Sequence, residues 1–167
     1  AAAHIFGHLS ASIVLSRKRA SQGLYPAVDP LQSESKMLSP AIVGERHYRT
    51  AQQVRSTLAE YEELKDIIAM LGEEELSQEE QNIVNRARRL ERFLTQPFHT
   101  AEQFTGNEGR TVDLADALDG CRRILDDEFH DYDMQDLYMI GRIDEAVESR
   151  EREEEEREAE PQEEAAS

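Results

Sequence analysis

Residues 54–72, VRSTLAEYEELKDIIAMLG, decide the fold class of this 167-residue chain. Large apolar residues recur here at intervals of three and four, which places them on one face of a helix that a neighbouring element must cover. That face consists of Val54, Leu58, Tyr61, Leu64, Ile68 and Leu71. The pattern predicts a long helix from about Gly44 to Leu71. Gly72 is expected to end it, because glycine readily adopts the left-handed conformation that closes a helix.

A second helix is expected directly after the acidic turn 73–76, EEEL. Ser77 is a suitable N-cap, and Glu80, three residues later, completes a capping box. The apolar face of this helix is expected to consist of Ile83, Ala87, Leu90 and Leu94. Pro97 ends the pattern, because proline lacks the backbone N–H that a helix interior needs.

A third helix is expected over about residues 113–127, and its apolar residues again share a face. That face consists of Leu114, Leu118, Cys121 and Leu125. The apolar cluster 137–140, LYMI, follows, and a last helix starts near Asp144 and dissolves within residues 151–167. Amphipathic helices joined by short connections predict a helical bundle.

The first 43 residues have a different pattern. Residues 12–15, SIVL, predict a short buried strand, and a brief helix ending at Gly23 is expected to follow. Three prolines and many serines in the stretch 25–40 predict an extended linker. The fold class is therefore mainly α, a C-terminal helical bundle preceded by a short α/β segment with one or two strands.

Composition limits the possible partners. The net charge is −17, and the stretch 144–164 alone holds 12 acids against three arginines. This excess argues against a nucleic-acid partner, because phosphate binding depends on Lys and Arg. The longest apolar runs are far shorter than the roughly 20 residues of a membrane helix, so we expect no direct membrane insertion.

The residues that commonly bind metals are sparse. The single cysteine, Cys121, excludes an internal disulfide. His4 and His8 share a helical spacing without a third ligand nearby, so we expect no metal site. A basic patch on the second helix is expected to pair with acids of neighbouring helices, and it consists of Arg86, Arg88, Arg89 and Arg92. The chain begins with Ala rather than Met, which indicates either processing or, as the favoured interpretation, a piece cut from a longer protein.

Several short motifs run through the chain in a fixed order. They are HL (8–9), VLSRK (14–18), LYPAVDPL (24–31), IVGE (42–45), HY (47–48), LKDIIAMLG (64–72), EELS (74–77), RFLTQPF (92–98), EQFTG (102–106) and LYMIG (137–141). In order and spacing they resemble the C-terminal portion of the catalytic beta subunit of the F-type ATP synthase, over about residues 5–148. Ser10 and Ser12 replace the common Asp and Thr of that family, which suggests the divergent second-operon branch of archaea and bacteria.

The resemblance implies a division of the chain. Residues 1–43 would be the C-terminal remnant of the α/β nucleotide-binding domain, residues 44–148 the helical C-terminal domain, and residues 149–167 an acidic disordered or frayed helical tail. The family's phosphate-cradling loop, catalytic carboxylate and magnesium-site acid have no counterpart in this sequence. We therefore expect ATP or ADP with Mg²⁺ as the ligand of the whole subunit, and no activity from this chain alone.

The resemblance also implies an adenine-binding rim. Tyr25 would stack on the adenine ring, while Phe98, Ala101 and Phe104 would line the pocket around it. From the residues alone, packed loop aromatics are the simpler interpretation, because aromatic side chains mostly serve burial.

A second implied site is the acidic loop that contacts the rotor in the family. It consists of Glu74, Glu75, Leu76, Ser77, Gln78, Glu79 and Glu80. The residues themselves equally favour a solvated helix start, where carboxylates complement the helix dipole. The implied partners are the alpha subunits and the central shaft of gamma and epsilon subunits.

The expected function is therefore part of proton- or sodium-driven ATP synthesis and hydrolysis, in a complex peripheral to the cytoplasmic face of the plasma membrane. The alternative is a free-standing acidic helical protein-interaction module without catalysis. An upstream reading frame that encodes the phosphate loop would favour the first, and a start codon at Ala1 the second.

Overall fold

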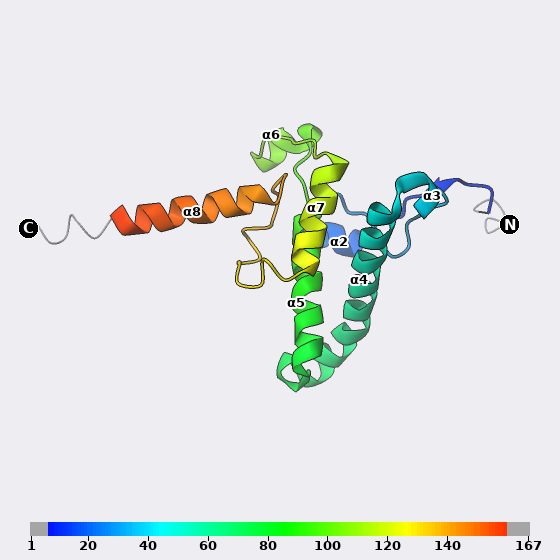
Figure 1. The fold of residues 1–167 in the computed structure, drawn as a ribbon, viewed down its shortest axis with the longest axis horizontal. Coiled ribbons are helices and arrows are strands. Elements are labelled where there is room, and N and C mark those ends of the chain that lie inside the picture. The colour runs from blue at the N-terminus through cyan, green and yellow to red at the C-terminus, as the bar shows by residue number, and fades with distance from the viewer. Residues whose placement is uncertain (1–6, 160–167) are drawn as a thin grey trace, which may run out of the picture.

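The computed structural model describes residues 7–159, apart from the side chains of residues 104 and 105, and it is mainly helical as the sequence predicts (Figure 1). The segment before the bundle holds β1 (Ala11–Ser12), α2 (Arg17–Ser21), β2 (Glu34–Ser35) and α3 (Pro40–Val43). The bundle and its connections hold α4 (Glu45–Leu71), η1 (Glu73–Glu75), α5 (Gln78–Phe93), η2 (His99–Ala101), α6 (Glu102–Thr105), α7 (Leu114–Leu125) and α8 (Asp144–Ala159).

The core lies where α4, α5 and α7 meet. Helices α4 and α5 form a hairpin that closes at the acidic turn, and α7 packs against both of them (Figure 1). The largest fully buried side chains are Phe129, Leu58, Leu90, Ile124, Leu137, Ile143 and Val84. Burial of one such side chain contributes about 1.5–3 kcal/mol. The cluster 137–140 thus supplies a core residue, Leu137, from the loop between α7 and α8.

The predicted end of α4 and the predicted start of α5 are confirmed. Gly72 has a φ of 96° and donates its N–H to the carbonyl of Ile68 at 3.0 Å. At the start of α5, the Ser77 N–H donates to the Glu80 carboxylate at 2.8 Å, and the Glu80 N–H donates back to Ser77 Oγ at 3.3 Å. Both bonds of the capping box are therefore present.

Three of the predicted core positions are wrong. Leu71, Leu94 and Leu114 have exposed fractions of 63%, 40% and 60%. Leu71 is the last residue of α4, Leu94 follows α5 and Leu114 is the first residue of α7, so each lies at a helix end that its neighbours do not cover. The buried face of α5 instead includes Val84 and Phe93, because both α4 and α7 pack against that helix.

The first segment forms a small antiparallel sheet rather than a buried strand over residues 12–15. Strand β1 pairs with β2, with Ala11 opposite Ser35, and an isolated bridge joins Leu15 to Val28. Ile13 and Leu15 are exposed by 73% and 75%, so the predicted burial of this strand is wrong. A strand buries its side chains only where a second layer covers them, and the described residues place no such layer over these two.

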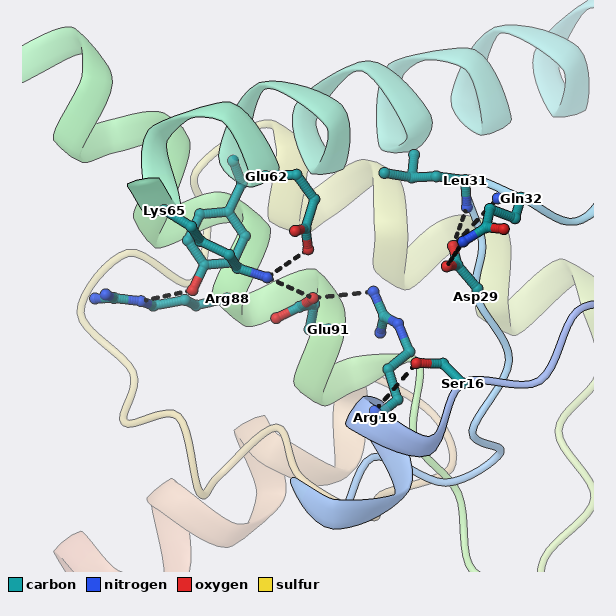
Figure 2. Close-up of polar contacts among 10 residues, drawn as sticks. Ser16, Arg19, Asp29, Leu31, Gln32, Glu62, Lys65, Arg88 and Glu91 are labelled. Carbon is teal, nitrogen blue, oxygen red and sulfur yellow. Dashed lines mark hydrogen bonds and ion pairs between the residues drawn. The ribbon is translucent and has the colours of Figure 1, made fainter. Parts of the chain in front are cut away.

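Two arginines fasten the first segment to the bundle. Arg55 of α4 donates to the carbonyls of Pro30, Leu31 and Ser33 at 2.6, 3.1 and 2.9 Å. Arg19 of α2 pairs with Glu91 of α5 at 3.0 Å (Figure 2). The position of residues 16–33 relative to the bundle is therefore set by specific polar contacts.

Helix α8 runs from the bundle into solvent (Figure 1). Ala146 is buried and Val147 packs against the core, whereas residues 151–159 are exposed. The helix continues to Ala159, within the stretch expected to be disordered or a frayed helix, and residues 160–167 lie outside the described part. Within residues 7–159, no helix combines the length and hydropathy needed to span a bilayer.

Candidate functional site

Tyr25, Phe98 and Ala101 line one cavity of about 410 Å³. Gln96, Pro97, Asn107 and Met139 complete its lining. Tyr25 is thus brought together with Phe98 and Ala101, two other predicted site residues that follow it by more than 70 positions in the sequence. The fourth, Phe104, belongs to α6, and its side chain lies outside the described part of the structure.

The turn after α2 presents Tyr25 to the cavity. Gly23 has a φ of 74°, the left-handed conformation that glycine adopts without strain, and it turns the chain between α2 and Leu24. Leu24 is buried at 5% exposure, whereas the neighbouring Tyr25 is 42% exposed. The Tyr25 carbonyl accepts a hydrogen bond from the Gln96 N–H at 2.9 Å, and the Tyr25–Pro26 peptide bond is cis. The ring therefore lies at the surface, unlike the packed aromatic that composition alone favours.

Another part of the lining is the irregular segment that follows α5. The Pro97 carbonyl accepts from the Arg110 N–H at 3.0 Å, which ties residues 95–98 to the loop after α6. That loop approaches η2 so closely that a Cβ on Gly109 would lie 2.3 Å from His99 Cα. The Gly109 N–H also donates to the Glu102 carboxylate at 2.7 Å. These contacts fix the backbone that carries Phe98 and Ala101.

The chemistry of the lining defines what the cavity can hold. None of its residues is an Asp, Glu, His, Lys or Arg, and its walls are mainly apolar. It can therefore hold a flat, largely apolar ring, but it supplies neither charge for a phosphate nor a carboxylate for proton transfer. Its volume lies within the roughly 300–1,000 Å³ range of small-molecule pockets.

Met139 and Asn107 are lining residues that the sequence reasoning missed. Met139 belongs to the cluster 137–140, which the sequence marks only as apolar. Asn107 belongs to a Gly-containing loop without periodicity. Gln96 and Pro97 could have been found, because they immediately precede Phe98.

The acidic turn lies at the far end of the α4–α5 hairpin from this cavity (Figure 1). Leu76 is buried and anchors the turn, while Glu74, Glu75, Ser77, Gln78 and Glu79 are exposed. Glu80 serves the capping box, and its hydrogen bonds with the Ser77 hydroxyl and N–H lower the pKa of its carboxyl. The exposed Met70 and Leu71 add apolar surface beside these carboxylates.

A polar groove between α2, α4 and α5 contains ion pairs that join the three helices (Figure 2). Glu91 lies 3.0 Å from Arg19 and 3.9 Å from Lys65, and Lys65 also pairs with Glu62 at 2.5 Å. Among residues 7–159, no group of three or more His, Cys, Asp or Glu side chains could hold a metal ion. The cavity lined by Tyr25 and Phe98 itself offers no carboxylate to Mg²⁺.

The basic patch on α5 pairs with acids only in part. Arg86 binds Asp127 at 2.5 Å and Arg88 binds Glu73 at 2.8 Å, as expected. Arg89 instead donates to backbone carbonyls, among them that of His130 at 2.6 Å. The guanidinium of Arg92 lies 5.2 Å from the centre of the Tyr138 ring. The difference arises because the loop after α7 brings carbonyls and a ring, rather than carboxylates, against these two positions.

A helical hairpin packed against a third helix, with an apolar pocket beside the segment that follows α5, defines a helical-bundle domain. Residues 36–133 match the family model described as the C-terminal domain of V and A type ATP synthase. The chain therefore belongs to this family. The F-type beta-subunit resemblance seen in the sequence is confirmed by curated relatives of that name.

Those relatives are much longer than this chain. It is 71% identical over 148 residues to ATP synthase subunit beta 1 of Marinomonas sp. (strain MWYL1), covering 89% of this chain and 30% of that protein. It is 72% identical over 146 residues to ATP synthase subunit beta 2 of Albidiferax ferrireducens, covering 87% of this chain and 28% of that protein. The solved structure of the ATP synthase subunit NeqB from Nanoarcheaum equitans superposes with a TM-score of 0.58 at 25% identity, over 71% of this chain and 28% of that one.

Proposed function

We propose that this chain supplies the adenine-binding rim of an ATP synthase beta subunit and, at the other end of α5, an acidic turn that contacts the rotor. The observation that carries the first part is the apolar cavity that Tyr25, Phe98 and Ala101 line together. A base stacked on an aromatic side chain gains about 1–3 kcal/mol. The exposed fractions of 42% for Tyr25 and 36% for Phe98 leave both rings accessible to such a base.

The phosphates of ATP or ADP would be held elsewhere in the subunit. The cavity lining holds no cation, and the sequence contains no Gly-x-x-x-x-Gly-Lys-Ser/Thr loop. The chain spans only 30% of the Marinomonas relative, so the remainder of such a subunit has room for the phosphate loop and the Mg²⁺ ligands. By itself this chain would bind the base weakly and would neither make nor hydrolyse ATP.

The second part of the proposal concerns the acidic turn. Its exposed carboxylates Glu74, Glu75 and Glu79 lie beside the exposed Met70 and Leu71, a combination that suits contact with a moving partner. Helix α5 has 16 residues and spans about 24 Å between this turn and the cavity. A rigid helix of that length would carry a displacement from one site to the other. The partners would be the alpha subunits and the gamma and epsilon subunits of the shaft.

We further propose that the complex is peripheral, on the cytoplasmic face of the plasma membrane, and coupled to proton or sodium flow. In an assembled complex, lysine at positions 75 and 79 would reverse the exposed charge without touching the capping box. We expect Glu75→Lys with Glu79→Lys to lower the torque of ATP-driven rotation. Unchanged torque would remove these carboxylates from the rotor contact.

Titration of the chain with adenosine tests the adenine rim. We expect Tyr25→Ala to weaken adenosine binding about 5- to 150-fold, which corresponds to one lost stacking contact. Tyr48→Ala is the matched control, because this half-buried tyrosine of α4 lies outside the cavity lining. Equal adenosine affinity in the Tyr25→Ala variant and the wild type would end the proposal and leave the interaction-module alternative.

A further inference from the structure

Met139 has an unusual backbone conformation. Its φ is 59°, and within residues 7–159 Asp127 is the other non-glycine residue with positive φ. An L-residue with a Cβ pays free energy to adopt this region, whereas glycine adopts it readily. Such strained residues cluster at ligand-binding sites, where the side chain is needed at that position. The presence of methionine rather than glycine therefore indicates that the side chain of residue 139 is used.

The core does not account for that use. Met139 is half-buried and is not part of the hydrophobic core cluster, whereas Leu137 is fully buried there. Met139 instead lines the cavity together with Tyr25 and Phe98. Methionine is a flexible and polarisable side chain that makes favourable contacts with aromatic rings.

A buried hydroxyl holds Met139 in this conformation. The Met139 N–H donates to Thr95 Oγ1 at 3.0 Å, and the same hydroxyl donates to the Arg92 carbonyl at 2.5 Å. Thr95 is only 3% exposed, so both bonds are shielded from water. Thr95 lies beside Gln96, whose N–H binds the Tyr25 carbonyl. The threonine thus connects the third wall of the cavity to the two walls that the sequence predicts.

We propose that Met139 is a further contact residue for the bound ring, and that Thr95 is its positioning residue. The ligand class is a planar nitrogen heterocycle of purine size, and the inference rests on the adenine rim proposed above. The thioether would pack against the ring and complete an apolar enclosure that the aromatic residues alone leave open.

Methyl resonances provide a direct test. The chain has four methionines, and [methyl-¹³C]methionine labelling gives one signal for each. Titration with adenosine is expected to shift the Met139 methyl signal upfield by ring current, with the same affinity as the ring signals of Tyr25 and Phe98. Met37 and Met70, exposed by 54% and 75% and absent from the cavity lining, are internal controls.

Variants at positions 139 and 95 distinguish a contact between the Met139 side chain and the ligand from an effect of the strained backbone. Met139→Gly relieves the strained φ, so it should fold at least as well as the wild type and still bind adenosine about 2- to 10-fold more weakly. Met139→Leu keeps the volume and should lose less affinity. Thr95→Val should abolish the adenosine-induced shift of the Met139 methyl signal, and Thr95→Ser, which keeps the hydroxyl, should restore it.

The outcomes distinguish this inference from the proposed function. Shifts at Tyr25 and Phe98 with a silent Met139 methyl group, and unchanged affinity in Met139→Gly, would overturn the role of Met139 and leave the adenine rim standing. If adenosine shifts neither aromatic ring, the adenine rim itself fails, and the role of Met139 fails with it.

Discussion

The Tyr138 hydroxyl donates a 2.7 Å hydrogen bond to the carbonyl of Gly23, across a sequence separation of 115 residues. This contact joins the loop before α8 to the turn after α2, directly beside the two cavity residues Met139 and Tyr25. The contact therefore holds two walls of the pocket relative to each other. Tyr138→Phe removes the hydrogen bond without changing a residue that lines the cavity.

We expect Tyr138→Phe to lower the free energy of unfolding by about 0.5–1.5 kcal/mol, because a part-buried carbonyl loses its donor. Gly23→Ala should cost more, since it adds a Cβ at a φ of 74° and only 3.1 Å from the Tyr138 hydroxyl. Chemical denaturation of both variants measures the effect. Tyr48→Phe on α4 is the control. If Tyr48→Phe and Tyr138→Phe change the free energy of unfolding equally, the hydrogen bond to Gly23 contributes nothing.

Gly120 of α7 lies against the ring of Phe93. A Cβ at position 120 would be 2.1 Å from Phe93 Cζ, closer than any real contact allows. Glycine to alanine inside a helix normally stabilises by about 1 kcal/mol. Here we expect Gly120→Ala to destabilise by about 1–3 kcal/mol through overpacking, which reverses the usual sign.

A second substitution checks this cause. Phe93→Leu shortens the side chain that the new methyl group would strike, so Gly120→Ala should cost less in a Phe93→Leu background than in the wild type. Thermal denaturation of the single and double variants gives the coupling. Additive effects would mean that the α5–α7 contact is not what requires glycine at this position.

Asp127 makes the stability of the fold depend on pH in the acidic range. The hydrogen bonds from Arg86 lower the pKa of its carboxyl below the ordinary value of 3.8, and His130 and Arg89 also favour the charged form. A carboxyl with a lowered folded-state pKa stabilises the fold above its unfolded-state pKa. That contribution is lost as the pH falls below about 4 and through the folded-state value.

Asp127→Asn should therefore flatten the loss of stability below pH 4 and reduce stability modestly at pH 7, since the pair is partly exposed. Asparagine tolerates the φ of 62° at this position, so the backbone is not a confounding factor. Urea unfolding between pH 2 and 7 measures both effects. If the variant loses stability below pH 4 as steeply as the wild type, Asp127 does not contribute to the pH dependence.

Cys121 should be chemically inert while the chain is folded. It is 5% exposed, and burial raises the pKa of its thiol to about 12, so almost no thiolate exists near neutral pH. Disulfide reagents should therefore modify it only as fast as the domain opens. Rapid labelling of the native chain at pH 8, without a rise in rate on adding denaturant, would contradict its burial in the core.

Much of the helical layout could be predicted from local pattern. The extent of α4, the glycine at its end and the capping box of α5 depend on residues within one or two turns of each other, and all three are confirmed. The buried faces depend on more than the local pattern. Leu94 and Leu114 satisfy the helical period, but whether such residues are covered depends on how far the neighbouring helices extend, and periodicity carries no information about that.

The sequence by itself determined the family, the helical hairpin and the candidate ring-binding residues Tyr25, Phe98 and Ala101, because these follow from motifs and from bonds between near neighbours. Only the tertiary structure decided that these residues share one cavity, and that Met139 forms its third wall through Thr95. The physical reason is that the deciding hydrogen bonds join segments tens of residues apart. Neither composition nor hydrophobic periodicity predicts such contacts, because they form only when the core brings the segments together.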